Sequence, residues 1–241
     1  MRLMMWSAPR GRSTAFFRMM AERGDFTVVH EPFSYLMMHG HADVGGIRAT
    51  SGPDVIRALL ELPGQVFAKE TTGVRYPEFV TMPEFLSGVT HTFLIRDPRE
   101  TIPSYLRIEP DAAVERIGFE LLHEIYTTVA ERAGHVGRQP VVVDAADLAR
   151  DPEGTVRAYC AAVGIPFVRD ALSWEPAHRP EWQPSRRWHE TVAASTGLGP
   201  VPPVPPLTPA SAAVPNALAA RYLRRHLPYY EALRARRLTP A

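Results

Sequence analysis

The sequence predicts a single α/β domain built on a largely parallel sheet. Short apolar runs alternate with amphipathic helical stretches, which is the pattern of such a sheet flanked by helices. The apolar content of 45% is enough for a buried core. The length of 241 residues, with no internal repeat, fits one large domain, and we expect one domain over 1–241.

Five apolar runs are the predicted strands, at residues 3–6, 26–29, 66–68, 91–95 and 140–143. Apolar residues at helical spacing predict helices at 13–21, 53–62, 102–106, 112–133 and 152–163. A last helical pattern at 217–237 is interrupted near Pro228. Ligands bind beyond the carboxyl ends of parallel strands, so we expect the loops that follow the first four strands to converge on one cleft.

Residues 174–209 have the composition of a lid or connector. The stretch 200–209 is so rich in proline that we expect extended, polyproline-like chain there. Segments 32–53 and 174–209 lack regular periodicity and contain aromatic residues, glycine and proline. We expect them to form the walls and lid of a binding site.

The overall charge excludes several classes of partner. Lys and Arg number 27 against 26 Asp and Glu, so the composition indicates neither a nucleic-acid surface nor a polybasic membrane patch.

No apolar run approaches the roughly 18 residues of a membrane-spanning helix, and the opening hexapeptide is too short for a signal peptide. A single cysteine, Cys160, excludes an intramolecular disulfide framework and a multi-cysteine zinc site. We expect a cytoplasmic protein.

The loop 9–14 carries the first candidate site. It joins a strand to a helix N-terminus, where free amide donors and the helix dipole favour an anion. Arg10 and Arg12 add charge, Gly11 allows close approach, and Ser13 and Thr14 add hydroxyl donors. The first glycine and the lysine of the mononucleotide P-loop are absent, which disfavours ATP with magnesium. The alternative is a loop with solvated arginines and Ser13 as the N-cap.

Arg96 and Ser104 form the second candidate site. Arg96 ends an apolar strand, an Asp97-Pro98 turn follows, and Ser104 lies in the next helix. A guanidinium and a hydroxyl so placed can face one oxyanion. The alternative is a surface pair of Arg96 with Asp97 and an ordinary helical serine.

Together the two elements resemble the sulfotransferases that use 3′-phosphoadenosine 5′-phosphosulfate (PAPS). Residues 9–14 resemble the 5′-phosphosulfate loop of that family, and Arg96 with Ser104 resembles its 3′-phosphate motif. The basic pair Arg186 and Arg187 stands where the family has a late loop that also reaches the 3′-phosphate. The resemblance implies a P-loop-like three-layer fold, PAPS as co-substrate, PAP as product, a small-molecule acceptor and no metal.

The sequence departs from the family at two loop positions. Arg12 replaces a usual glycine, and Ala15 replaces a tryptophan that several members place against adenine. A stacking face could instead come from one of four aromatic residues, Phe16, Trp174, Trp182 or Trp188.

The resemblance also suggests catalytic residues. Arg10 would hold the 5′-phosphate and the leaving oxygen. Glu31 is the first candidate for the general base, with His30 as the alternative. Lys69 resembles the family lysine that contacts the transferring sulfuryl oxygens. Structural roles remain open: Glu31 as a capping carboxylate before a helix, and Lys69 in a surface pair with Glu70.

We therefore predict transfer of a sulfuryl group from PAPS to a hydroxyl or amine of a small molecule. Three alternatives remain: an ATP-dependent small-molecule kinase, a non-catalytic protein that binds PAP or a similar nucleotide, and an enzyme that uses another sulfuryl donor such as an aryl sulfate.

Overall fold

A five-stranded parallel sheet forms the centre of the molecule. The computed structural model describes residues 1–76, 82–134, 139–199 and 216–239. The strands follow the order β2-β5-β1-β6-β7, and every neighbouring pair is parallel. They are β1 (Arg2–Ser7), β2 (Thr27–His30), β5 (Val66–Thr71), β6 (Thr90–Ile95) and β7 (Val141–Asp144). The predicted fold class is confirmed.

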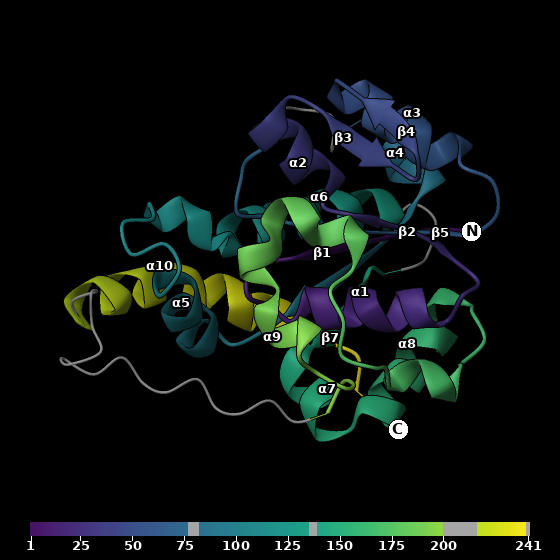
Figure 1. Cartoon of the computed structure of the whole chain (residues 1–241). Helices are drawn as coiled ribbons and strands as arrows, with labels where there is room; N and C mark the ends of the chain where they lie inside the picture. The colour runs from purple at the N-terminus through teal and green to yellow at the C-terminus, as the bar shows by residue number, and fades with distance from the viewer. Residues whose placement is uncertain (77–81, 135–138, 200–215, 240–241) are drawn as a thin grey trace.

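Helices cover both faces of this sheet (Figure 1). One face packs against α1 (Ser13–Glu22), α7 (Ala145–Arg150), α8 (Pro152–Val163) and the 3-10 helix η3 (Arg169–Leu172). The other face packs against α2 (Pro32–His39), α3 (Gly52–Glu61), α4 (Pro83–Gly88), α5 (Pro98–Leu106), α6 (Phe119–Gly134) and α10 (Asn216–Arg234). A small hairpin of β3 (Ala42–Val44) and β4 (Ile47–Ala49) extends the second layer.

Burial on both faces explains why the strands are continuous apolar runs. Along β1, Met4 and Trp6 belong to one core cluster, whereas Leu3 and Met5 belong to the other. Side chains alternate between faces along a strand, so a strand covered on both sides needs an apolar residue at every position.

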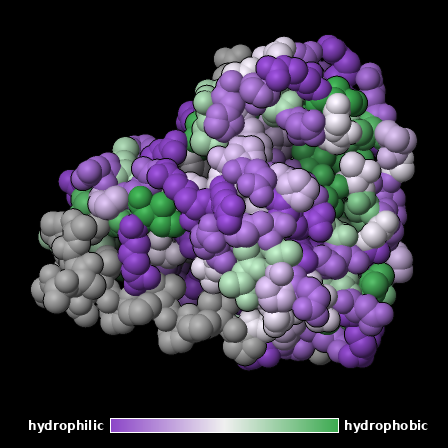
Figure 2. Space-filling model, in the orientation of Figure 1, coloured by the Kyte–Doolittle hydropathy of each residue, from purple (hydrophilic) through white to green (hydrophobic). Residues whose placement is uncertain are grey.

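The segment after α8 closes over the carboxyl end of the sheet. It contains the 3-10 helix η4 (Pro180–Trp188) and the short helix α9 (Glu190–Ala193). Figure 2 shows that the molecular face over these elements is mainly hydrophilic. No helix in the described ranges combines the length and apolar character that a bilayer crossing requires.

Two sequence-based expectations about helices need correction, and a third, for the proline-rich stretch, falls outside the described residues. The helix predicted from residue 112 begins later, because Val114–Ile117 forms the 3-10 helix η2 and Gly118, at φ 85°, separates it from α6. Pro228 lies inside α10, which is not divided there. The proline-rich stretch 200–209 lies outside the described residues. The hairpin of β3 and β4 and the helices α2, α4, α7 and α9 were not predicted, and α2 lies in the segment 32–53, which was expected to lack regular periodicity.

Candidate active site

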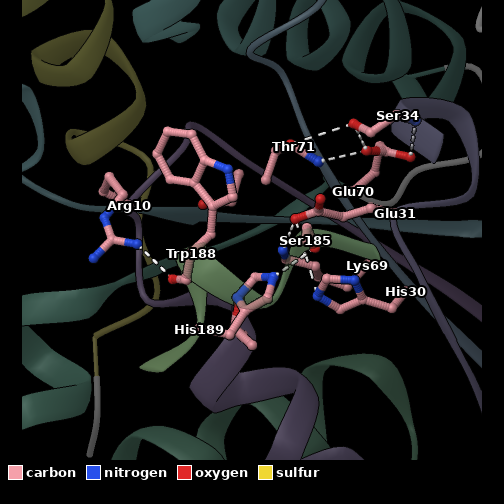
Figure 3. A network of polar contacts seen from close by, with 12 residues as sticks. Arg10, His30, Glu31, Ser34, Lys69, Glu70, Thr71, Ser185, Trp188 and His189 are labelled. Carbon is pink, nitrogen blue, oxygen red and sulfur yellow. Dashed lines mark hydrogen bonds and ion pairs between the residues drawn. The ribbon is translucent and has the colours of Figure 1, made fainter. Parts of the chain in front are cut away.

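A cleft lies at the carboxyl end of the sheet, where the loops after four strands meet. Its walls come from the loop after β1, from Glu31 after β2, from the end of β5, from Arg96 after β6, and from the segment of η4 and α9. The convergence predicted from the strand pattern is thus present. Figure 3 shows the polar groups that gather on one side of it.

The loop 9–14 has a backbone suited to surrounding an anion. Arg10 and Arg12 both adopt left-handed conformations, at φ 65° and 70°, and α1 begins at Ser13. A Cβ on Gly11 would lie 2.2 Å from the Ser7 hydroxyl oxygen, so only glycine lets the loop fold back on β1. The N-cap of α1 is Arg12, so the alternative in which Ser13 caps the helix is wrong. The amide donors of the first turn of α1 face this loop.

Hydrogen bonds join the two predicted anion-binding elements. The Arg10 Nε donates to Ser104 Oγ at 2.9 Å, and Arg10 Nη1 donates to the Trp188 carbonyl oxygen at 2.7 Å. Arg96 Nη1 donates to the carbonyl oxygen of Arg10 at 3.2 Å. The Arg96 guanidinium pairs with Glu100 at 2.7 Å, so the alternative of a surface pair with Asp97 is wrong.

Burial and mutual repulsion act on the arginines of the loop. Burial, and then the positive charge of Arg96, lower the pKa of Arg10 and lower that of Arg12 to about 10. An anion between the guanidinium groups would offset both effects, because its negative charge stabilises the charged form of each arginine. Arg12 Nη2 also donates to the carbonyl oxygens of Leu198 at 3.2 Å and Gly199 at 2.9 Å.

Glu31 and Lys69 form a buried ion pair at the cleft wall. Lys69 lies within β5 with 1% of its side chain exposed, and its Nζ contacts Glu31 Oε1. Glu31 adopts φ 46°, and its amide donates to the Lys69 carbonyl oxygen at 2.7 Å. The alternative of a surface pair between Lys69 and Glu70 is therefore wrong: successive side chains of a strand point to opposite faces.

Glu70 takes the structural role that was left open for Glu31. Its carboxylate accepts hydrogen bonds from the amides of Phe33 at 2.8 Å and Ser34 at 3.2 Å, in the first turn of α2. The Tyr76 hydroxyl donates to it at 2.9 Å. Burial, and then the charge of Glu31, raise the pKa of Glu70 to about 7. Glu31 occupies the N-cap position without a side-chain capping bond, so its carboxylate stays at the cleft.

A chain of hydrogen bonds runs from His30, behind the cleft, to Ser185, His189 and Thr14 in the cleft wall. His30 Nδ1 bonds with the Tyr35 hydroxyl at 2.9 Å, and that hydroxyl bonds with Ser185 Oγ at 2.7 Å. Ser185 bonds with His189 Nε2 at 2.9 Å, and His189 Nδ1 bonds with Thr14 Oγ1 at 3.2 Å. Three segments far apart in sequence are thereby tied together, and Figure 3 labels His30, Ser185 and His189 of this chain.

His30 is poorly placed to receive a proton from a bound molecule. It is fully buried and does not line the main cleft, whereas Glu31 does. Burial, and then the charge of Lys69, lower the pKa of His30 well below 6.5. Its Nε2 lies 3.9 Å from Glu31 Oε1 and has no hydrogen-bond partner among the described residues. Of these two candidates, only Glu31 lines the main cleft.

His30, Glu31 and His189 bring ligand atoms within 4.8 Å of one another, as a metal site would. Both ring nitrogens of His189 and Nδ1 of His30 already take part in hydrogen bonds, and Lys69 places an ammonium group on Glu31. A positive charge in that position opposes a metal cation.

The late basic pair lies outside the cleft. Arg186 pairs with Glu190 at 3.4 Å and Arg187 pairs with Glu109, and both arginines are exposed. Neither lines the cleft in this arrangement.

Only one of the four candidate stacking residues reaches the cleft. Trp188 lines it and packs on Tyr105, with ring centroids 5.1 Å apart. The other three, Phe16, Trp174 and Trp182, are buried in the core beneath α1.

Comparisons with known proteins bear on the family and the fold of the chain. The family model described as a sulfotransferase domain matches residues 1–237. Branched-chain-amino-acid aminotransferase-like proteins 2 and 1 of Arabidopsis thaliana are each 31% identical over 204 residues, which is 80% of this chain. The chain spans 35% and 36% of the length of these two relatives, about a third. The fold is similar to that of a sulfotransferase domain from the curacin biosynthetic pathway, with a TM-score of 0.50, 12% identity, and coverage of 81% of this chain and 83% of that one.

Proposed function

The chain belongs to the sulfotransferase domain family, and we propose that it transfers a sulfuryl group from PAPS to a hydroxyl or amine of a small molecule. The observation that carries this proposal is the contact between the loop 9–14 and the Arg96–Ser104 element. Two anion-binding elements so joined suit a donor with phosphate groups at both its 5′ and 3′ positions.

The residues present fit such a donor. The loop, with its obligatory Gly11 and the first turn of α1, offers amides and the hydroxyls of Ser13 and Thr14 to a 5′-phosphosulfate. Arg96 and Ser104 would hold the 3′-phosphate. Burial and the positive charge of Arg96 lower the pKa of Arg10. Anionic oxygens between the two guanidinium groups would offset this lowering by stabilising their charged forms. PAPS, when bound, supplies a sulfuryl group on a good leaving phosphate.

Glu31 and Lys69 would share the catalytic work. Lys69 can turn from Glu31 to the sulfuryl oxygens, where its charge would stabilise the transition state. Glu31, freed from this ion pair, would take the proton of the acceptor hydroxyl or amine as its oxygen or nitrogen bonds to sulfur. The bond between sulfur and the phosphate oxygen breaks in the same step, and PAP leaves with both electrons. Transfer then needs positioning and charge stabilisation from this chain, by analogy with phosphoryl transfer.

Calorimetric titration tests the proposal. The protein is titrated with PAP and with ADP, each with and without Mg²⁺. We expect PAP to bind without metal and ADP to bind much more weakly. Magnesium-dependent binding of ADP would instead indicate a kinase, and PAP binding without turnover of any acceptor would indicate a binding protein.

An arginine pair supplies a matched control for this titration. The Arg96→Ala variant should lose PAP affinity. The Arg99→Ala variant should keep it, because Arg99 is exposed, pairs with Asp97 and does not line the cleft.

A further inference from the structure

Arg116 lines the cleft, and its backbone on η2 is fixed by packing. A Cβ on Gly73 would lie 3.2 Å from the Arg116 carbonyl oxygen and 2.8 Å from the Pro9 ring, so η2 packs directly on the loop after β5. The Thr72 hydroxyl donates to the Gly118 carbonyl oxygen at 2.8 Å and fixes the other end of this contact. The backbone of Arg116 is therefore held beside the end of the strand that carries Lys69.

Arg116 places an unpaired positive charge at the cleft wall. The residue is half-buried and lines the cleft, yet its guanidinium makes no hydrogen bond, ion pair or ring contact with any residue that the structure describes.

The other cations of the cleft wall are all engaged. Arg10 bonds with Ser104 and the Trp188 carbonyl, Arg12 with two carbonyl oxygens, Lys69 with Glu31, and Arg96 with Glu100. A guanidinium has five fixed donors and stays charged at any physiological pH. The Arg116 guanidinium is therefore available to bind an anionic group.

Arg116 lies at the end of the cleft formed by the loop after β5, and it also lies close to the start of the anion loop 9–14. The proposed donor contacts lie at the loop after β1 and at Arg96 and Ser104 beyond β6. Arg116 adjoins the loop after β5 at Gly73, a residue that also packs on Pro9 of the anion loop. The cleft lining further includes Val74 of the β5 loop, Ser34 and Met38. A molecule whose reacting group meets Glu31 and Lys69 would extend along this end.

We propose that Arg116 binds an oxyanion, most simply a carboxylate, on the acceptor molecule. The inference rests on the proposed sulfuryl transfer and narrows its substrate class to acidic acceptors: hydroxy acids or amino acids in the broad sense. The planar guanidinium matches a carboxylate with two parallel hydrogen bonds, which also fixes the distance from the acid group to the reacting hydroxyl or amine.

The test compares matched pairs of acceptors. A panel of hydroxy acids of increasing chain length is assayed beside their methyl esters, with PAP release as the readout. The stabilisation of the protein–PAP complex against heat by each compound gives a second readout that needs no turnover. We expect acids to exceed their esters in kcat/KM by about tenfold to hundredfold, the range typical of a charge-assisted bidentate bond. Acids should also raise the melting temperature of the complex more than their esters do.

Variants decide whether Arg116 is the cause. Arg116→Ala should abolish the preference for acids through a higher KM while leaving PAP affinity unchanged, and Arg116→Lys should restore part of it. Arg48→Ala removes an exposed arginine of β4 outside the cleft and should behave as the natural protein does.

Two outcomes would overturn the inference. One is equal or better response to esters across the panel in both readouts, with PAP still bound. The other is a loss of PAP affinity in Arg116→Ala, which would assign the residue to the donor. Failure of PAP to bind the natural protein would instead count against the proposed function itself.

Discussion

Replacing Glu31 by glutamine should destabilise the protein as well as stop turnover. Lys69 is 1% exposed and the Glu31 side chain 10% exposed, so the substitution leaves a buried ammonium without its counter-charge. Removing one partner of a buried ion pair costs about 3–5 kcal/mol, and we expect the lower end because glutamine can still accept one hydrogen bond. At roughly 2–4 °C per kcal/mol for a chain of this size, the melting temperature should fall on the order of 10 °C.

A double-mutant cycle separates the loss of the charge from the loss of the base. Glu31→Gln and Lys69→Met are each melted alone and then combined, with PAP affinity and turnover measured in parallel. Replacing a buried ion pair by uncharged groups is often neutral, so the double variant should recover most of the lost stability without recovering turnover. Affinity for PAP should be unchanged in Glu31→Gln. This account of the ion pair would be refuted if Glu31→Gln had the melting temperature of the natural protein, or if it still released PAP with an acceptor.

Three further predictions concern the rest of the site. Arg10→Ala and Arg96→Ala should each weaken PAP binding about tenfold or more in calorimetry, and unchanged affinity in both would remove the proposed donor site. Tyr35→Phe removes the hydroxyl that bonds with His30, and should lower the free energy of unfolding by about 1–3 kcal/mol in denaturant titration without changing PAP affinity. The pKa of Glu70 rises on folding from its ordinary 4.5 to about 7, so the folded state binds the extra proton between these values. The free energy of unfolding should therefore contain a contribution that falls as pH rises from about 4.5 to 7, and Glu70→Gln should flatten this dependence in denaturant titrations across that range; an unchanged slope would contradict it.

The strands and the anion loop could be predicted from the sequence because their causes are local. A strand covered on both faces must be apolar at successive positions, and all five such runs became strands of the sheet. The glycine, arginines and hydroxyls of 9–14 are contiguous, so their joint chemistry is visible without a structure. The boundary at Gly118 was missed because an apolar helical pattern spans it, although its glycine permits the left-handed turn.

The partners inside the site could not be predicted, because they are distant in sequence. The hydroxyls of Tyr35 and Ser185 meet across 150 positions, and Thr14 meets His189 across 175. Each of these residues alone has no pattern that would separate it from an ordinary buried or surface residue. Lys69 was expected just after a strand at 66–68, but β5 continues to Thr71 and contains Lys69. The burial of Lys69 and its pairing with Glu31 depend on this longer strand, which the apolar run alone did not predict.

Backbone strain gives an independent reason to regard this cleft as the functional site. Arg10, Arg12 and Glu31 are the three non-glycine residues with positive φ in the described part of the chain, and all three line the cleft. Such conformations cost about 1–3 kcal/mol each and persist only where surrounding contacts impose them. Here each strained residue is tied through its own side chain: Arg10 to Ser104, Arg12 to two carbonyl oxygens, and Glu31 to Lys69. A bound donor would compete for two of these ties, at Arg10 and through Lys69. Without a ligand, the strained residues are therefore held by contacts within the protein. In the proposed reaction, contacts to the donor would replace two of these, as expected for a site that binds a highly charged anion.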